Sequence, residues 1–218
     1  MFHDIIEFDQ QLLLAINGAH CSYADNLMCL ISSRESWLLI ILSLLFVLRS
    51  GWKRALVVIL IIAIVITLAD QISSTFIKPL VARFRPTHDP GLQSLVHVVD
   101  GYRSSLYGFV SSHAANSFAA ATTMAFLTRN RHVAATFAIW AAITCYSRMY
   151  LGVHFPGDIL GGTLLGIAVA LAVGFAAKAS PLSKFAPDAF QFTKSECKIL
   201  ACTVWINMLI ISILALVW

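Results

Sequence analysis

Residues 55–86 read ALVVILIIAIVITLADQISSTFIKPLVARFRP, a long apolar run that ends in a cluster of basic residues. A helix needs roughly 20 apolar residues to cross the hydrocarbon core of a bilayer, and the apolar part, Ala55–Phe76, reaches that length. Lys78, Arg83 and Arg85 follow it directly. Ionisable residues at the edge of a membrane span are costly and usually functional. The stretch therefore predicts a membrane helix with a functional site at its end.

The composition of the whole chain indicates a membrane protein. Its 218 residues are 59% hydrophobic and only 12% charged, whereas a soluble domain carries about 25% charged residues. We therefore predict one all-α membrane domain over residues 1–218, with six transmembrane helices and a motif-bearing core over residues 60–175. Polar residues 32–35 interrupt the first span, so its outer part is expected at the membrane interface. The predicted spans are Leu27–Leu48, Ala55–Phe76, Ala114–Leu127, Val133–Tyr146, Ile159–Ala177 and Ile199–Trp218.

The first 20 residues favour an amphipathic helix. They contain no Lys or Arg and carry Asp4, Glu7 and Asp9, which is the reverse of the basic start of a signal peptide. Their apolar residues recur at helical spacing, which predicts an N-terminal amphipathic helix on the membrane surface. An ordinary helix packed on the protein explains the same spacing. The apolar residues are Phe2, Ile5, Ile6, Leu12, Leu13 and Ile16.

Lysine and arginine are distributed unevenly between the connections. Three connections between predicted spans carry most of them, and such basic connections are typical of the cytoplasmic side. Both termini and the basic cluster after Phe76 are then expected to face outward. The residues that set this bias are Arg49, Lys53 and Arg54, then Arg129 and Arg131, then Lys178, Lys184, Lys194 and Lys198.

Two further segments carry residues that suit phosphate chemistry. Ser111-Ser112-His113 precedes the third predicted span, and residues 147–158 (SRMYLGVHFPGD) precede the fifth. With Lys78–Pro86 they give the spacing K-x6-RP, S-x-H and SR-x5-H-x3-D, which resembles the three signature motifs of the type 2 phosphatidic acid phosphatase superfamily. The resemblance implies an integral-membrane lipid phosphatase of bacterial type. For a protein of the bacterial inner membrane, the outward side indicated by the Lys/Arg bias is the periplasm, so the active site is expected to face the periplasm.

The basic residues of these segments are candidates for binding phosphate. A phosphate monoester carries close to two negative charges and three strong acceptor oxygens. Lys78, Arg85 and Arg148 are the candidate cations, and the planar guanidinium of arginine suits bidentate bonds to phosphate. Basic residues at a membrane edge also extend toward lipid headgroups without a catalytic role. Arg83 matches no position of the motifs and is expected to contact such headgroups.

The resemblance implies roles for two histidines and one aspartate. His154 would be the nucleophile that forms a phosphohistidine, and Asp158 would hold its imidazole in the required tautomer. His113 would be the general acid that protonates the leaving oxygen. Ser111 and Ser112 would bind phosphoryl oxygens at a helix start, where unpaired N–H groups favour anions. Taken alone, His113 is better explained as a helix-capping or interfacial histidine, and helix capping is the alternative explanation for the His154–Asp158 pair.

The middle motif departs from the family pattern, and a long connection precedes it. Val110 and Ser112 stand where the family has proline and glycine. If that glycine is left-handed, Ser112 costs about 1–2 kcal/mol there. If the glycine only allows close approach, the serine hydroxyl contacts phosphate instead. Residues 87–109 are long enough to be functional, either as a lid over the pocket or as a tether without substrate contact.

No metal site and no cofactor are expected. The chain has no H-E-x-x-H, no Cys-x-x-Cys and no EF-hand loop, so the cations alone would balance the phosphate charge. The basic residues form no continuous stripe, and we expect no nucleic-acid binding. The expected partners are a lipid phosphate and membrane lipids; the sequence does not indicate an oligomeric state. The remaining histidines, His3, His20, His88, His97 and His132, are scattered and expected to be structural or solvent-facing.

The functional hypothesis is metal-independent hydrolysis of a lipid phosphate or diphosphate at the outer face of the membrane. The resemblance suggests undecaprenyl diphosphate or a lipid A phosphate first, with phosphatidylglycerophosphate or phosphatidate as alternatives. A phosphohistidine could also pass its phosphoryl group to a second lipid, which would make the protein a phosphotransferase. A non-catalytic carrier that binds lipid phosphate would also explain the cations, but it leaves the two histidines unexplained.

Overall fold

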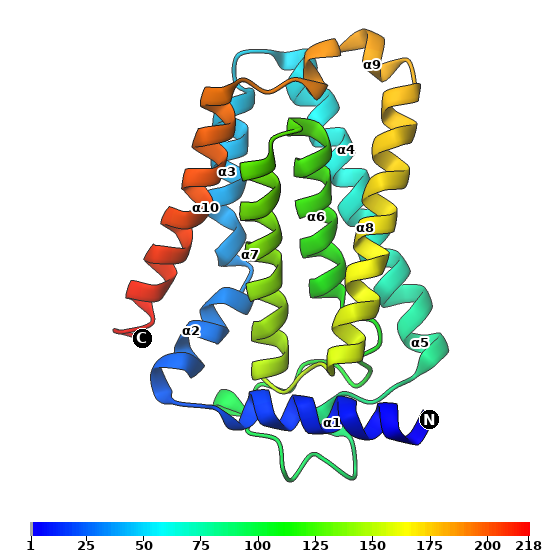
Figure 1. The fold of residues 1–218 in the computed structure, drawn as a ribbon, viewed down its shortest axis with the longest axis vertical. Coiled ribbons are helices and arrows are strands. Elements are labelled where there is room, and N and C mark those ends of the chain that lie inside the picture. The colour runs from blue at the N-terminus through cyan, green and yellow to red at the C-terminus, as the bar shows by residue number, and fades with distance from the viewer. Residues whose placement is uncertain (1) are drawn as a thin grey trace.

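The computed structural model describes residues 2–218, with side chains from residue 4 onward, and the chain forms a bundle of helices (Figure 1). Helices make up 77% of the chain, and the described residues contain no β-strand. The all-α prediction is therefore confirmed. The helices are α1 (Phe2–Gly18), α2 (Ser22–Ser32), α3 (Leu38–Leu48), α4 (Trp52–Gln71), α5 (Lys78–Val81), α6 (Ser112–Thr128), α7 (Arg131–Tyr150), α8 (Pro156–Ala179), α9 (Leu182–Phe185) and α10 (Lys194–Leu214).

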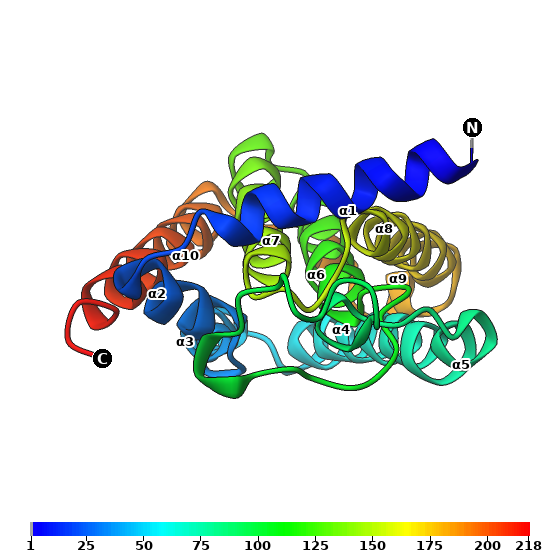
Figure 2. The same cartoon turned by 90° about the horizontal axis from the view of Figure 1, so that it is seen from below.

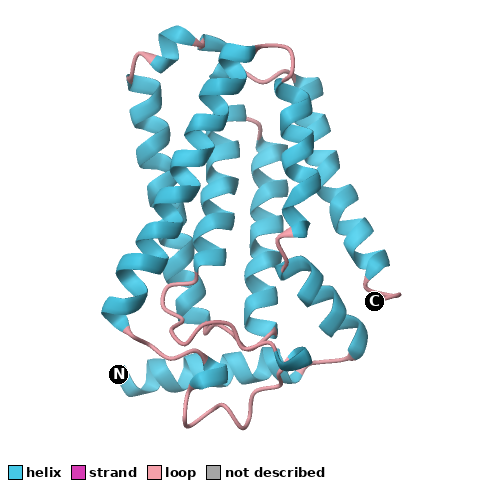
Figure 3. Ribbon diagram, turned by 180° about the vertical axis from the view of Figure 1, so that it is seen from behind, coloured by secondary structure: helices cyan, strands magenta, loops and turns pink. Residues whose placement is uncertain are grey.

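The long helices run side by side, and α1 lies across one end of them (Figures 1 and 2). α6 is central, because it packs against α4, α7 and α8, while α10 packs against α3 and α7. The loop between α5 and α6 lies at the same end as α1, whereas α9 lies at the opposite end (Figures 1 and 3). The starts of α6 and α8 and the end of α7 all point to the α1 end, which brings the predicted motif segments together there.

Close packing of α6 on α8 holds the first turns of these helices against each other. The small side chains of Ala114 and Ala115 in α6 are fully buried. Gly162 of α8 lies so near α6 that an added Cβ would be 2.4 Å from the carbonyl oxygen of Ser111. The amide of Ser111 also donates to the carbonyl of Asp158 at 3.0 Å. Predicted site residues on two separate helices are thus fixed relative to one another.

Within the described part of the chain, three helical segments are long and apolar enough to cross a membrane, namely Trp52–Val81, Pro156–Ala179 and Lys194–Leu214. The first of these continues α4 through a turn of π-helix into α5. The bent pair Ser22–Ser32 and Glu35–Leu48 gives a fourth crossing if it counts as one span. α6, with 17 residues, is shorter than these segments. The predicted number of six spans therefore stays a prediction.

The first predicted span is bent by 69° between α2 and the helical turn that leads into α3. The hydroxyl of Ser33 donates to the carbonyl of Leu30, and that of Ser36 donates to the carbonyl of Ser33, both at 2.8 Å. Such local bonds compete with the continuation of a helix. The polar residues at 32–35 thus produce a sharp bend, and this bend borders the candidate site.

The N-terminal segment is helical, as its spacing predicts. α1 packs on α7 and α8 and buries Leu13 and Asp9. Ile5, Ile6 and Phe8 are exposed, so an apolar face remains uncovered. Such a face is what a membrane-surface helix requires, and the location of α1 on a membrane stays a prediction.

Candidate active site

The predicted site residues come from separate parts of the chain and lie at the α1 end of the bundle. A turn of π-helix, Ile72–Ile77, precedes Lys78 at the start of α5, and Arg85 lies in the loop that follows. Residues 111–113 start α6, Arg148 lies in the last turn of α7, and residues 154–158 lead into α8. Ser112 and His113 are half-buried. The buried members are Lys78, Arg85, Ser111, Arg148, His154 and Asp158.

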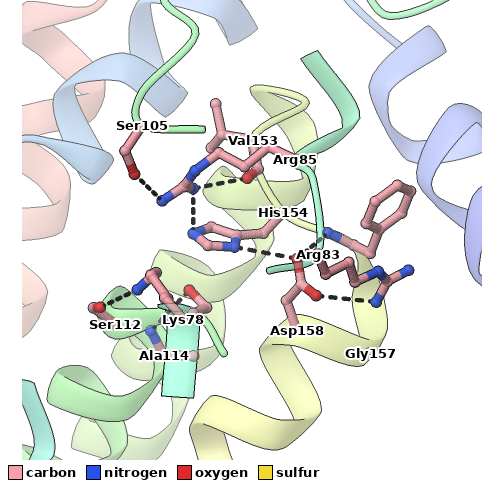
Figure 4. Close-up of polar contacts among 12 residues, drawn as sticks. Lys78, Arg83, Arg85, Ser105, Ser112, Ala114, Val153, His154, Gly157 and Asp158 are labelled. Atoms are coloured by element: carbon pink, nitrogen blue, oxygen red, sulfur yellow. Dashed lines mark hydrogen bonds and ion pairs between the residues drawn. The ribbon is translucent and has the colours of Figure 1, made fainter. Parts of the chain in front are cut away.

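Both nitrogens of the His154 ring have partners (Figure 4). Nη1 of Arg85 lies 2.6 Å from Nε2. Because a guanidinium can only donate, Nε2 carries the lone pair and Nδ1 carries the proton, which faces Oδ2 of Asp158 at 3.4 Å. Burial and the charges of Arg85, Arg148 and Lys78 lower the pKa of His154 well below its usual range. The imidazole is therefore neutral at physiological pH, with its lone pair on Nε2, as a nucleophile requires.

Two further donors hold the carboxylate of Asp158. The amide of Phe155 donates to Oδ2 at 3.0 Å, which caps the start of α8, and Nη1 of Arg83 donates to Oδ1 at 3.0 Å. Because α8 begins at Pro156, the spacing of four residues brings the carboxylate back across the turn to His154. Asp158 therefore both caps the helix and contacts the imidazole, so the two explanations offered by the sequence are compatible.

Arg83 and Asp9 lie behind this carboxylate. Nη2 of Arg83 is 2.6 Å from Oδ2 of Asp9 in α1, and Oδ1 of Asp9 accepts from the amide of Gly157 at 2.7 Å. The guanidinium also lies over the ring of Phe155, 4.0 Å from its centroid. The prediction that Arg83 contacts lipid headgroups is wrong, because carboxylates bind both of its terminal nitrogens. No sequence signal pairs Asp9 with Arg83, since only the fold brings them together.

Arg83→Gln is expected to lower kcat by about 10- to 100-fold, because Asp158 loses a charge-assisted donor and no longer holds the imidazole in place. Asp9→Asn should act in the same direction with a smaller effect. The double variant should lose less activity than the two single losses combined, since Asp9 acts in part through its contact with Arg83. Steady-state kinetics of the three variants checks this, with Glu7→Gln on the same helix as the control. Fully additive losses would contradict a shared contact.

Lys78, Arg85 and Arg148 are buried, and none of them has an acidic partner among the residues that the structure describes. The ion pairs found among the described residues include none of the three. Nζ of Lys78 donates to Oγ of Ser112 at 2.5 Å, and Nη2 of Arg148 donates to the hydroxyl of Tyr102 at 3.0 Å. A buried charge is costly unless an opposite charge balances it. The arrangement therefore suits an anionic ligand that contacts all three cations.

The loop between α5 and α6 contacts two of these cations. Nη2 of Arg85 donates to Oγ of Ser105 in this loop at 3.1 Å, while Nη1 donates to the carbonyl of Val153 at 2.8 Å. Burial and the charge of Arg148 lower the pKa of Arg85 to about 10, which leaves the guanidinium charged at neutral pH. Tyr102, the partner of Arg148, belongs to the same loop. These contacts favour a lid over a distant tether.

Residues 111–113 include Ser112, which stands where the family has glycine, and their structure shows the effect of this difference. The hydroxyl of Ser111 accepts from the amide of Ala114 at 3.4 Å, which makes Ser111 the N-cap of α6. Ser112 is the first helical residue and is not among the described residues with a positive φ. A left-handed conformation, with its cost, therefore does not arise. The hydroxyl of Ser112 instead anchors Lys78 (Figure 4).

Two cavities open beside His113. One cavity, of about 490 Å³, is also lined by Arg34 and Tyr102. The other, of about 430 Å³, is also lined by Arg34 and Ser112. Arg34 lies at the bend between α2 and α3, so this bend forms part of the wall of both cavities. Sequence reasoning missed this wall because no motif includes residues 32–35.

Gly108 lies against the His154–Asp158 pair. A Cβ added at this position would be 2.8 Å from Oδ2 of Asp158 and 3.6 Å from Nδ1 of His154. We expect Gly108→Ala to lower kcat by about 10-fold or more, because it pushes the carboxylate out of position. The control is Gly91→Ala in the same loop, where the nearest atom to an added Cβ is 3.4 Å away. Assays of both variants with thermal unfolding in detergent check this, and equal activities would contradict it.

A second cluster of titratable groups lies outside this site. Ligand atoms of His20, Asp25 and His97 are all within 4.8 Å of one another. The expectation that the remaining histidines are scattered is therefore wrong for His20 and His97, whose rings stack at 3.7 Å with 6° between their planes. Imidazole lone pairs lie in the ring plane, so parallel stacked rings do not converge on one metal ion. Nε2 of His97 instead contacts Asp25 at 3.1 Å, which joins the loop to α2.

Known proteins similar to this chain share one family. The family model described as PAP2 superfamily matches residues 52–181, more than half of the chain. The chain is 38% identical over 169 residues to the lipid A 4'-phosphatase of Bacteroides thetaiotaomicron, which covers 76% of the chain and 75% of that protein. It is 37% identical over 169 residues to the lipid A 4'-phosphatase of Porphyromonas gingivalis, which covers 76% of the chain and 71% of that protein.

Two solved structures are similar in fold. LpxE of Aquifex aeolicus aligns with a TM-score of 0.56 and 26% identity, over 75% of this chain and 92% of that one. A transmembrane PAP2-type phosphatidylglycerolphosphate phosphatase of Bacillus subtilis aligns with a TM-score of 0.59 and 25% identity, over 81% of this chain and 88% of that one. The family match and the identity to the curated relatives agree with the motif spacing. The chain therefore belongs to the PAP2 superfamily and is a lipid phosphatase.

Proposed function

We propose that this protein removes a phosphate group from lipid A through a phosphohistidine on His154, without a metal ion. The observation that carries the proposal is the burial of Lys78, Arg85 and Arg148 around this imidazole, with no acidic partner for any of them in the described part of the chain. Such a pocket is electrostatically incomplete until a phosphate group enters it. Relatives named lipid A 4'-phosphatase, at 38% and 37% identity, support this choice of substrate.

In the first step Nε2 of His154 attacks phosphorus, and the bond between phosphorus and the sugar oxygen breaks. The leaving oxygen takes a proton from protonated His113, so the lipid departs as an alcohol. Asp158 accepts the hydrogen bond of the Nδ1 proton and stabilises the positive charge that develops on the imidazole. The structure supports this order of roles because Nδ1, and not Nε2, faces the carboxylate.

The cations act on the phosphoryl oxygens. Nη1 of Arg85 donates to the attacking nitrogen in the structure. Bound phosphate would replace that contact with a charge-assisted bond to oxygen, which frees the nitrogen lone pair. Lys78 and Arg148 then hold the other oxygens, together with the serines at the start of α6, Ser111 and Ser112.

In the second step water cleaves the phosphohistidine. His113, neutral after the first step, accepts a proton from the attacking water. The bond between phosphorus and Nε2 of His154 breaks, and inorganic phosphate leaves. The cycle consumes one water molecule, returns both histidines to their starting states, and releases the lipid alcohol and phosphate.

We further propose that the chain crosses a bacterial inner membrane six times and that its site faces outward, into the periplasm. α6 and α7 lie alongside the long apolar helices (Figure 3), so they would cross the membrane with them. The connections at the α9 end carry most of the basic residues outside the site, which is typical of the cytoplasmic side. The exposed apolar face of α1 would then rest on the outer leaflet, with Ile5, Ile6 and Phe8 in contact with lipid.

A second candidate substrate is phosphatidylglycerophosphate. The Bacillus subtilis phosphatase named for that substrate is similar in fold, with a TM-score of 0.59. Its identity to this chain is 25%, against 38% for a lipid A 4'-phosphatase, so lipid A is favoured. Transfer of the phosphoryl group to a second lipid, or binding without turnover, would use the same cations, and the reaction products distinguish these activities from hydrolysis.

Phosphate release by the purified protein in detergent with EDTA tests the proposal. The substrates are lipid A, undecaprenyl diphosphate, phosphatidylglycerophosphate and phosphatidate, with mass spectrometry of the products. We expect release from lipid A with the loss of one phosphate group. A phosphorylated second lipid would indicate transfer, and binding without any product would indicate a carrier. Release from another lipid alone would overturn the choice of substrate.

A further inference from the structure

A groove leads away from the candidate catalytic residues between α3, α4 and α6. Ser112 and His113 form part of its wall, and its volume is about 430 Å³. Asp70 of α4 and Asn116 of α6 line the same groove. The proposed mechanism uses neither of these two polar side chains, although both lie next to residues that it does use.

Asp70 and Asn116 form a hydrogen-bonded pair, and one acceptor atom of this pair has no donor among the described residues. Nδ2 of Asn116 donates to Oδ1 of Asp70 at 3.1 Å. Oδ1 of Asn116 is buried and has no hydrogen-bond partner among the described residues. An acceptor left in this state costs free energy, and a carboxylic acid within a membrane helix usually marks a functional site. The pair therefore suits a ligand that brings a hydroxyl or an amide N–H.

The groove also has an apolar wall formed by Trp37, Ile41 and Ile66. Trp37 and Ile41 line a second, smaller cavity of about 70 Å³ as well, which Leu44 and Met124 help to enclose. The two spaces thus share a wall between α3 and α4. A ligand that fits here is polar beside His113 and apolar beyond it.

We propose that this groove binds the sugar and an acyl chain of the phosphorylated lipid. Asn116 and Asp70 accept hydrogen bonds from an amide N–H or a hydroxyl next to the phosphate, and the chain lies along Trp37 and Ile41. The inference rests on the proposed function and deepens it, because it names the part of the substrate that is selected. The groove selects acylated amino sugars, whereas a polyprenyl diphosphate offers no donor beside its phosphate groups.

The selection has a physical basis. A site built to accept a hydrogen bond rejects a ligand without the donor, because the buried acceptor then stays unpaired. An apolar wall alone discriminates weakly between lipids, because acyl and prenyl chains both bring apolar surface to it. The pair formed by Asp70 and Asn116 is therefore expected to decide between headgroups, and the wall at Trp37 to contribute affinity.

The test compares lipid A with p-nitrophenyl phosphate, a soluble ester that has neither a sugar nor an acyl chain. Asn116→Leu removes the unpaired acceptor, and Ile41→Trp fills the apolar part of the groove. Each variant should lower kcat/KM for lipid A by about 10-fold or more, while kcat/KM for the soluble ester changes by less than about 2-fold. Gln71→Leu, at an exposed position beside Asp70, is the control and should match the wild type on both.

Each outcome bears on one claim or on both. Equal losses on lipid A and on the soluble ester would overturn the inference, because Asn116 would then only support the catalytic residues. Lipid A activity that survives both variants would overturn the groove alone and leave the proposed function intact. Wild-type protein that hydrolyses undecaprenyl diphosphate but not lipid A would overturn the groove and the proposed function together.

Discussion

His154→Asn is expected to lower kcat for phosphate release by about 10⁴-fold or more, because the variant lacks the nitrogen that attacks phosphorus. Asparagine fills most of the same space beside Asp158 and Arg85, so the fold should survive. The measurement is single-turnover kinetics with radiolabelled substrate, followed by trapping of an acid-labile phosphoenzyme. Wild-type protein should form this species, and the variant should not.

Two further variants separate the roles of the histidines. His132 lies in the first turn of α7, away from the site, so the His132→Asn variant should behave as the wild type. His113→Asn should retain far more activity toward p-nitrophenyl phosphate than His154→Asn, since a good leaving group needs little protonation. A phosphoenzyme that still forms in the His154 variant would exclude this residue as the nucleophile.

Arg85→Lys is expected to lower kcat/KM by about 10²- to 10³-fold, although it keeps the positive charge. The guanidinium reaches the carbonyl of Val153, Nε2 of His154 and the hydroxyl of Ser105 at the same time. A lysine ammonium cannot present several donors in one plane, so both the loop contact and the contact to phosphate weaken. The measurement is kcat/KM, with inhibition by inorganic phosphate as a separate measure of anion binding.

Arg103→Lys provides the matched control. Arg103 lies in the same loop and donates to the carbonyl of Thr87, so the change alters an arginine outside the proposed phosphate contacts. It should cost little activity. If Arg85→Lys also matches the wild type, positive charge alone suffices at that position, and the planar guanidinium is not required there.

The sequence was sufficient for the family and for the helical class of the fold. Both depend on local properties: the length of apolar runs, and the spacing of Lys78, Arg85, His113 and His154 within short segments. Both predictions are confirmed. The number of spans is harder to predict, because α6 has only 17 residues and the first span is bent. Length and hydropathy then no longer distinguish a crossing from a packed helix.

The side chains that support the site could not be predicted. Arg83 matched no motif, and its contact with Asp9 joins residues separated by 74 positions. The contact between Asn116 and Asp70 spans 46 positions, and it also depends on how two helices pack. Single residues of this kind carry no periodic signal, and their partners lie outside any window of local sequence.

The sequence by itself determined that the chain is a helical lipid phosphatase with a basic and imidazole-rich site, because motif spacing and apolar length are local and survive in any arrangement of the helices. Only the tertiary structure decided that the Nε2 lone pair of His154 faces Arg85 and that Arg83 holds Asp158. It also decided that Ser112 anchors Lys78. These contacts depend on the closeness of α6 to α8 and on the position of α1 across the bundle, which are set by packing over long distances in the chain.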